Sequence, residues 1–349
     1  MKTVKITINT LNLRKIIFSA AILIIISLIA VSAVFIYYNS APDSQKTMNI
    51  TIEKGSTLRS TATFLEENNL IRNKTFFILL GYAADKKTIL AGRFRIFENS
   101  SSLSILKRLT TGMVITQKVT IPEGYNMYQI AESLENENIC MAQDFLHYAK
   151  DKSFMETLGI DSGTAEGYLF PDTYIFAEGS DPRDVISYMK KKMDDVLKEI
   201  RARSPETDYS VQQMLTIASI IEKEAVKKEE RPMISAAFHN RLKKGMRFDS
   251  CATVWYAIGK YDGGHLTKSD LNVDSPFNTY KHSGFPPTPI ASPGKSSIEA
   301  AFNPVAVPYV FFVARNDGSH YFSITLSRHN QAVAYYQKGE RNGFIDDQK

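Results

Sequence analysis

Residues 217–225 read Ile-Ala-Ser-Ile-Ile-Glu-Lys-Glu-Ala, and this stretch determines how the second half of the chain is interpreted. The spacing predicts a helix over residues 211–226, in which Glu224 follows three isoleucines by three, four and seven positions. A carboxylate is therefore expected on the apolar face of a buried helix. Glu222 lies on nearly the opposite side of that helix, so the two carboxylates do not form a catalytic pair with each other.

The position of Glu224 suits two roles. Apolar surroundings raise the pKa of a carboxyl group and keep it protonated near neutral pH, as a general acid acting on a glycosidic oxygen requires. Lys223, Lys227 and Lys228 are close in sequence, so a solvated charge near a helix end is the alternative. Helix geometry alone leaves both roles open.

Further elements follow from similar patterns. Gly167 and Pro171 interrupt a helix-rich stretch from about 126 to 203, which predicts an aromatic loop at residues 166–174. The pattern also predicts a helix at 231–244, a turn leading into a helix at 246–256, an ordered irregular segment at 275–303, and a hairpin of strands 309–314 and 321–325 that turns at Asn316-Asp-Gly318.

Charge is unevenly distributed along the chain. The 349 residues carry a formal net charge of +5, and 44% are hydrophobic, enough for a sizeable core. Residues 1–15 contain four basic residues and no acid, which leaves only +1 for the remainder. A protein with so little net charge outside its first residues is not built to bind a polyanion, so nucleic acid is excluded as an expected partner.

Residues 16–38 contain no charged side chain and are long enough to cross a bilayer. Basic residues precede them, and Tyr37 and Tyr38 end them as an interfacial anchor. We expect an uncleaved single-pass anchor with residues 1–15 in the cytoplasm, followed by a linker at 39–48. A cleaved signal peptide is the alternative, although its apolar region is usually shorter.

The two cysteines, Cys140 and Cys251, are few for an exported protein, and the sequence leaves open whether they form a disulfide. Neither has the spacing of a metal ligand, so no metal or other cofactor is expected.

A weak internal repeat relates residues 50–71 to residues 119–140, with about a third of the positions identical. Each copy predicts a short strand, a turn at Gly55 or Gly124, and an amphipathic helix. The first copy continues with a second helix near 74–84 and a strand near 90–97. This β-α-α-β order resembles LysM-type glycan-binding modules, and a small α+β spacer domain is the alternative.

One carboxylate stands out where glycosidases normally use two. A single acid is sufficient when the substrate supplies its own nucleophile, as in lytic cleavage of murein. There one glutamate protonates the leaving oxygen and then acts as the base while the sugar's C6 hydroxyl attacks the anomeric carbon.

Several separate motifs, in order, resemble the endolytic murein transglycosylase (YceG-like) family. They are EGYLFPDTY at 166–174, ASIIEKEA at 218–225, ER followed after seven residues by HNRLKKGMRFDS at 230–250, NTYKHSGFPPTPIASPG at 278–294 and HYFSITLSRHN at 320–330. The likeness extends over nearly the whole of the chain beyond the predicted anchor. One departure is Cys251-Ala252, where many relatives have Asp-Pro.

The resemblance implies a single-pass enzyme of the inner (plasma) membrane, with its catalytic domain outside the cytoplasm, that cuts nascent peptidoglycan strands internally. It implies Glu224 as the general acid and base, Glu222 as a supporting residue, and peptidoglycan polymerases as partners. By the same resemblance the residues that bind substrate are Glu166, Tyr168, Arg241, Asn278, Thr279 and Tyr280. We expect Arg241 to pair with a buried carboxylate such as Glu222 or Glu230, and His320 to make structural hydrogen bonds.

The predicted fold class is α+β. It comprises a transmembrane helix, a LysM-like module at 49–118 and a mixed catalytic domain at 119–345 built around the Glu224 helix. The alternatives to an endolytic lytic transglycosylase are a glycan-binding scaffold without activity and a muramidase that uses water as the nucleophile.

Overall fold

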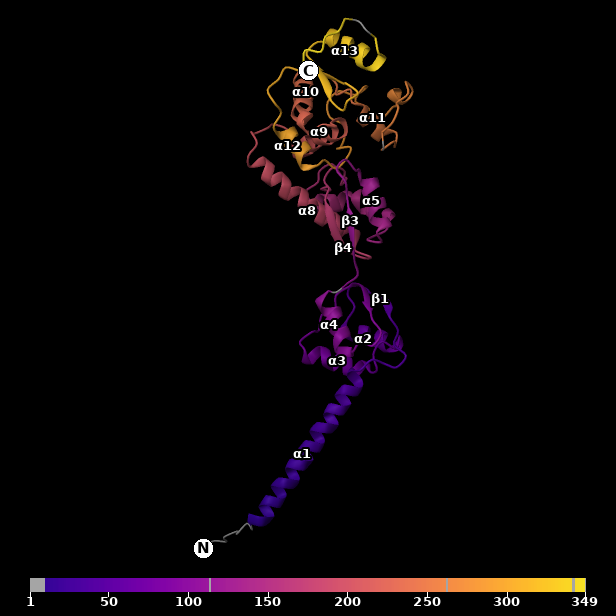
Figure 1. The fold of residues 1–349 in the computed structure, drawn as a ribbon, viewed down its shortest axis with the longest axis vertical. Helices are drawn as coiled ribbons and strands as arrows, with labels where there is room; N and C mark the ends of the chain where they lie inside the picture. The colour runs from indigo at the N-terminus through magenta and orange to yellow at the C-terminus, as the bar shows by residue number, and fades with distance from the viewer. Residues whose placement is uncertain (1–9, 113, 262, 341–342, 349) are drawn as a thin grey trace. The chain divides into compact units, whose positions relative to one another are not determined.

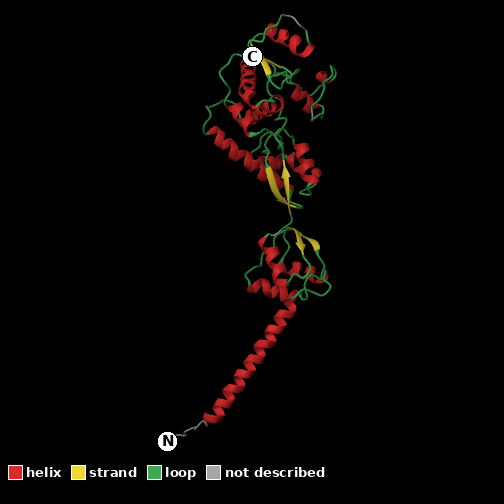
Figure 2. Ribbon diagram, in the orientation of Figure 1, coloured by secondary structure: helices red, strands yellow, loops and turns green. Residues whose placement is uncertain are grey.

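The computed structural model describes residues 10–112, 114–261, 263–340 and 343–348 of the chain. It is a mixed α+β protein, as the sequence predicted, and it divides into two compact units (Figures 1 and 2). The first unit ends at Thr116 and the second begins at Gln117. Each unit has its own hydrophobic core.

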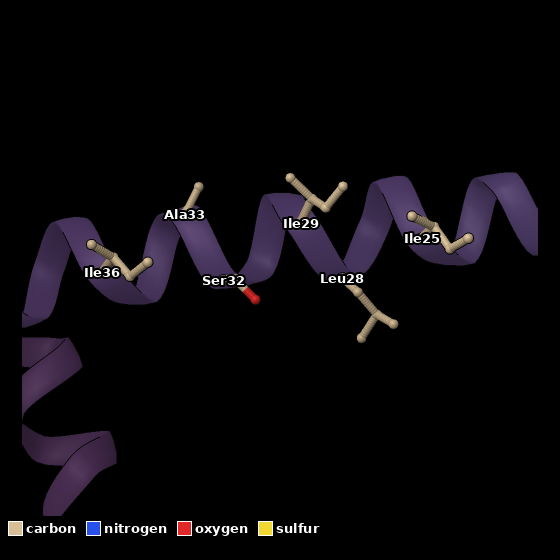
Figure 3. A pocket seen from close by; sticks show the side chains of 6 residues that line it. All are labelled: Ile25, Leu28, Ile29, Ser32, Ala33 and Ile36. Atoms are coloured by element: carbon tan, nitrogen blue, oxygen red, sulfur yellow. The ribbon is translucent and has the colours of Figure 1, made fainter.

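The chain enters the first unit through α1 (Thr10–Asn39), a helix without any amphipathic pattern. Its segment Ile17–Asn39 has a mean hydropathy of 2.8 and is long and apolar enough to cross a membrane. Figure 3 shows one stretch of this helix, with six side chains between Ile25 and Ile36 projecting from the ribbon, and all six are exposed. The predicted apolar helix is therefore present, and it fits a single-pass membrane anchor.

The rest of the first unit follows the predicted β-α-α-β order and adds one helix. Its elements are β1 (Met48–Ile52), α2 (Leu58–Glu67), α3 (Lys74–Ala83), β2 (Gly92–Ile96) and α4 (Ser102–Thr111). The two strands pair antiparallel, with Ile50 opposite Phe94, and alternate residues of each strand enter the core. The likeness to a glycan-binding module remains a prediction.

The internal repeat is visible in the backbone of the second unit, where β3 (Thr116–Thr120) leads into α5 (Met127–Asn136). Thr57 and Asn126 begin the two matching helices, each with a capping box. Gly55 and Gly124, which precede these caps, both have positive φ, at 90° and 81°. The same local conformations therefore recur in both copies.

Helices α6 (Ala142–Ala149), α7 (Lys152–Thr157) and α8 (Pro182–Arg201) complete the middle of the chain. The aromatic loop interrupts the helices as predicted, because Gly167 has a φ of 79° and lies against Pro289. The strand β4 (Thr173–Ala177), which pairs with β3, was not predicted.

The remaining elements surround α9 (Val211–Glu224), whose residues from Met214 to Ile221 are all buried. They are α10 (Arg231–Lys243), α11 (Cys251–Ala257), α12 (Lys295–Phe302), β5 (Phe311–Ala314), β6 (His320–Ser323) and α13 (Leu326–Lys338). Helices α10, α11 and α12 contact α9 (Figure 1). The predicted hairpin is confirmed as β5 and β6, with positive φ at Asn316 and Gly318 in its turn. Helix α12 was missed within the segment predicted to be irregular.

Candidate active site

Glu224 is the last residue of α9, two residues before the predicted end of that helix. The residue is partly exposed, but its carboxyl group is surrounded by protein. Ser250 donates a hydrogen bond of 2.5 Å from its hydroxyl to Glu224 Oε1, and the backbone N–H of Ala252 also stabilises the charged carboxylate. Burial outweighs both interactions and raises the pKa of Glu224 above its usual range. The group therefore holds a proton to higher pH than an exposed glutamate does.

A set of hydroxyl groups holds Ser250 in place. The Ser250 N–H donates to Thr279 Oγ1 at 3.1 Å, and Thr253 Oγ1 donates to the Ser250 carbonyl at 2.8 Å. Thr253 and Thr279 also share a hydrogen bond of 2.8 Å between their hydroxyls. Both threonines are buried, so their hydrogen bonds hold the backbone of Ser250 against the interior of the unit.

Tyr280 and Cys251 form a second contact near Glu224. The Tyr280 hydroxyl and Cys251 Sγ are 3.2 Å apart, and both side chains are partly exposed. Burial raises the pKa of both groups, and the negative charge of Glu224 adds to each shift, so the phenol and the thiol stay neutral. Cys140 and Cys251 are both free thiols, which answers the question that the sequence left open.

Glu222 faces a different part of the unit, as its opposite helical position predicted. Its Oε1 accepts a hydrogen bond of 2.8 Å from Arg231 Nη2, and its Oε2 accepts one of 2.9 Å from the N–H of Gly294. Both side chains of the ion pair are only 6% exposed. Arg231 also donates to Ser296 Oγ. This buried pair ties the last turn of α9 to the starts of α10 and α12.

The predicted partner of Arg241 was wrong. Arg241 donates to the carbonyl oxygens of Val310 at 2.6 Å and Phe248 at 2.8 Å, and it forms an ion pair of 3.0 Å with the half-buried Asp249. Glu222 is taken by Arg231. Glu230 instead accepts from His320, with 2.7 Å between His320 Nδ1 and Glu230 Oε2.

Two predicted substrate-binding residues are buried in the loop of residues 166–174. Glu166 is 0% exposed, and its carboxylate accepts from the N–H of Met127 at 3.2 Å and from the hydroxyl of Tyr256 at 3.0 Å. Burial raises the pKa of Glu166 to about 7, against the opposing effect of these two hydrogen bonds. Tyr168 packs into the core of the second unit.

The side-chain amide of Asn278 cross-links the backbone on both sides of it. Its Nδ2 donates to the carbonyl oxygens of Leu271 at 3.0 Å and Val273 at 2.9 Å, and its Oδ1 accepts from the Tyr280 N–H at 3.1 Å. Asn278 is 0% exposed. Its amide therefore shapes the chain that presents Tyr280.

The structure thus brings Glu224, Thr279 and Tyr280 together around Ser250, which sequence reasoning did not single out. Its signal was a serine directly before a predicted helix, where it would be expected only to cap that helix. Among the residues that the structure describes, no group of three His, Cys, Asp or Glu side chains could hold a metal ion.

A polar groove of about 550 Å³ lies elsewhere on the second unit. Residues of α5 and of the segment after α11 line it, among them Tyr125, Gln129, Glu132, Lys260 and Tyr261. Lys223, next to Glu224, donates to the carbonyl oxygen of Tyr261 at 3.3 Å. This lysine links the groove to the end of α9.

Comparison with known proteins gives a consistent result. The YceG-like family matches residues 50–335. A Bacillus subtilis protein named endolytic murein transglycosylase is 33% identical over 313 residues, 84% of this chain and 86% of that protein. A Streptococcus pneumoniae protein of the same name is 30% identical over 86% of this chain and 60% of its own length. The crystal structure of a YceG-like protein from Listeria monocytogenes is 33% identical, with a TM-score of 0.56, over 82% of this chain and 99% of that one.

Proposed function

The chain belongs to the YceG-like family, and on that premise we propose that it is an endolytic murein transglycosylase with Glu224 as its general acid and base. The substrate is a peptidoglycan strand, cut internally at the β-1,4 bond between N-acetylmuramic acid and N-acetylglucosamine. The products are a strand with a 1,6-anhydro end and a strand with a free 4-hydroxyl.

The observation that carries this proposal is the environment of Glu224. Its carboxyl group is enclosed, its pKa is raised by burial, and it accepts a hydrogen bond from the hydroxyl of Ser250, whose backbone is held by two buried threonines. A protonated carboxyl at the edge of a partly exposed site can donate its proton to a glycosidic oxygen. A glutamate ion-paired on the surface would be ionised and would have no proton to give.

Three other acids near the end of α9 have partners in the described structure. Glu222 accepts from Arg231, Glu230 accepts from His320, and Asp249 accepts from Arg241. Hydrolytic glycosidases use a second carboxylate, either to attack the sugar or to activate water. Engagement of these three favours a reaction in which the substrate itself provides the nucleophile.

The reaction then runs in two proton transfers. Glu224 gives its proton to the glycosidic oxygen as the bond from that oxygen to the anomeric carbon breaks. The C6 hydroxyl of the same muramic acid forms a new bond to the anomeric carbon and returns its proton to the Glu224 carboxylate. The enzyme ends in its starting protonation state, and no water is consumed.

The residues assigned to substrate binding divide into two groups. Tyr280 is partly exposed beside Glu224 and can contact the sugar directly. The side chains of Glu166, Tyr168, Arg241, Asn278 and Thr279 are buried, so we assign them to positioning the backbone and side chains that form the site. Cys251 stands where many relatives have Asp, and the mechanism does not require a carboxylate there.

We place the catalytic unit outside the cytoplasm, with α1 crossing the membrane and its basic N-terminal side inside. The first unit is assigned to holding a glycan strand. Association with peptidoglycan polymerases remains a prediction from the family resemblance.

The test is mass spectrometry of peptidoglycan strands incubated with the purified full chain in detergent. Wild type and the Glu229→Gln control, which changes an exposed glutamate nearby, should both produce internal 1,6-anhydro ends. A folded Glu224→Gln variant should produce none. Reducing ends, which are one water heavier, would instead identify a muramidase, and binding without cleavage by wild type would favour a scaffold.

A further inference from the structure

Helix α3 exposes an apolar face that a soluble domain would normally make polar. After Lys74 the helix reads Thr-Phe-Phe-Ile-Leu-Leu-Gly-Tyr-Ala, with no charged residue. Phe77 and Gly81 are buried, and Gly81 lies so close to Leu58 of α2 that a Cβ there would meet it at 2.5 Å. The other side of α3 carries Leu79 and Tyr82, which are 61% and 60% exposed. Amphipathic surface helices place polar residues at such positions.

This face begins against the end of the membrane-spanning helix. The ring of Phe76, in the first turn of α3, lies 5.6 Å from that of Phe35 and 5.8 Å from that of Tyr38. Phe35 is four residues before the end of the apolar segment at Asn39, which corresponds to roughly 6 Å along a helix. Phe76 therefore lies beside the last turns of the apolar segment of α1.

Helix α4 fixes the unit to the same point. Ser102 donates from its hydroxyl to the Tyr38 carbonyl at 3.1 Å, and the Leu103 N–H donates to Asn39 Oδ1 at 3.0 Å. Leu103 is 44% exposed. Figure 1 shows α3 on the side of the first unit where α1 ends. Two hydrogen bonds and the ring contacts thus orient α3 relative to the anchor.

We propose that α3 is an interfacial helix whose outer side chains, Phe76, Leu79 and Tyr82, lie in the headgroup region of the bilayer that α1 spans. This surface is continuous with α1. It begins beside Phe35, roughly 6 Å before the end of the apolar segment, and interfacial helices enter a membrane to ~5–10 Å. Basic residues flank α3 on both sides in sequence. Arg72 stacks on Tyr37 and Lys87 lies over the ring of Tyr82, an arrangement that suits the interface because the charged groups can stay in water while the rings lie among the lipids. The inference rests on the proposed membrane span and not on the cleavage reaction.

The consequence is a fixed position for the first unit. Two attachments, α1 and α3, hold it flat against the outer leaflet, whereas a single helix would let it tilt. A glycan strand that this unit holds is then held at the height of the lipid headgroups.

The experiment measures the depth of single tryptophans in the full chain, reconstituted in liposomes. Trp255 is first replaced by Phe, which leaves no native tryptophan. Leu79→Trp then reports on α3, and Thr51→Trp is the matched control on β1, an exposed position in the strand pair that lies away from α1 in Figure 2. Ile29→Trp reports on the middle of α1. Quenching is compared with lipids brominated near the headgroup and deep in the acyl chains.

We expect Leu79→Trp to emit at shorter wavelength and to lose more than half of its emission with shallow bromines, while Thr51→Trp is unchanged. Equal quenching at residues 79 and 51 would overturn the proposal. The proposal would also be overturned if the emission of Leu79→Trp shifted to shorter wavelength but was not quenched by either bromine, and if the shift disappeared at a lower ratio of protein to lipid. That result would mean that a second copy of the chain covers α3. Absence of deep quenching at residue 29 would instead overturn the membrane span itself.

Discussion

Ser250 precedes α11 at the position where a serine usually caps a helix, yet its hydroxyl donates to Glu224 at 2.5 Å. Helix α11 has no side-chain cap from this residue. The hydroxyl of Ser250 does not cap the N-terminus of α11, and it orients the carboxyl group of Glu224 instead. The pair links the end of α9 to the start of α11 across 26 residues of sequence.

Ser250→Ala should lower kcat by about 10- to 100-fold, because a hydrogen bond to a charged group contributes about 1.5–3 kcal/mol. The bond stabilises the ionised form of Glu224 and so lowers its pKa. Its loss raises the pKa, and the alkaline limb of the pH–rate profile should move to higher pH. Ser250→Thr keeps the hydroxyl and should retain both rate and profile. An alanine variant with wild-type rate and profile would contradict the assignment.

Glu222→Ala should destabilise the second unit by about 3 kcal/mol, because Arg231 stays charged in a buried site and keeps only the longer ion pair of 3.9 Å with Glu123. Both side chains are 6% exposed, so water cannot readily replace the lost partner. Urea unfolding of the full chain would measure the loss. Glu222→Gln keeps an acceptor for Arg231 and should cost less than the alanine change. Equal stability of the alanine variant and wild type would show that the pair is not structural.

Glu166 should make stability depend on pH. Its pKa is raised from 4.5 to about 7, so between these values the folded chain keeps a proton that the unfolded chain has lost. The free energy of unfolding therefore falls as the pH rises through this window, by about 3 kcal/mol for this group. Glu166→Gln cannot lose a proton, and its stability relative to wild type should rise by that amount from pH 4.5 to 8.

The control for this titration is Glu156→Gln, which changes an exposed glutamate of α7 and should follow wild type at every pH. Glu224 contributes a dependence of the same sign, so the Glu166 variant should keep part of the slope. Parallel curves for wild type and Glu166→Gln would show that Glu166 is ionised in the folded protein throughout this range.

Asn278→Ala should destabilise the second unit by about 1–3 kcal/mol and reduce activity, because it removes the partner of three half-buried backbone groups. Among them is the N–H of Tyr280, the residue beside Glu224. Asn272→Ala is the matched control, since that amide is exposed on the same segment. Thermal unfolding and anhydro-end formation would be measured together. Loss of activity without loss of stability would instead indicate direct contact of Asn278 with substrate.

Local signals in the sequence were sufficient for the elements that depend on local chemistry. The isoleucine spacing before Glu224 predicted α9, and Asn316-Asp-Gly318 predicted the hairpin, because its turn needs residues that accept positive φ. Strand β4 gave no such signal. Thr173–Ala177 is five residues long, and its partner β3 lies more than fifty residues earlier, so pairing over distance creates it.

Partners across the site were beyond the reach of sequence for a related reason. Arg241 was correctly placed on its helix, but three carbonyl oxygens and Asp249 surround its guanidinium. Carbonyl acceptors have no sequence signature, since every residue has one. Motif resemblance assigned Asn278 and Thr279 to substrate binding, and only the folded structure shows that their side chains bond to the protein's own backbone and hydroxyls.

The repeated strand–turn–helix segments also bear on how the chain folds as it is made. In each copy the cap, the glycine turn and an asparagine of positive φ two residues after the helix, Asn69 or Asn138, are within about twenty residues of one another. Contacts this local form quickly, and domains fold from the N-terminal side during synthesis. In each unit this segment can take its native shape before its strand partner has emerged. Strand pairing waits for the later strand to be made, β2 in the first unit and β4 in the second.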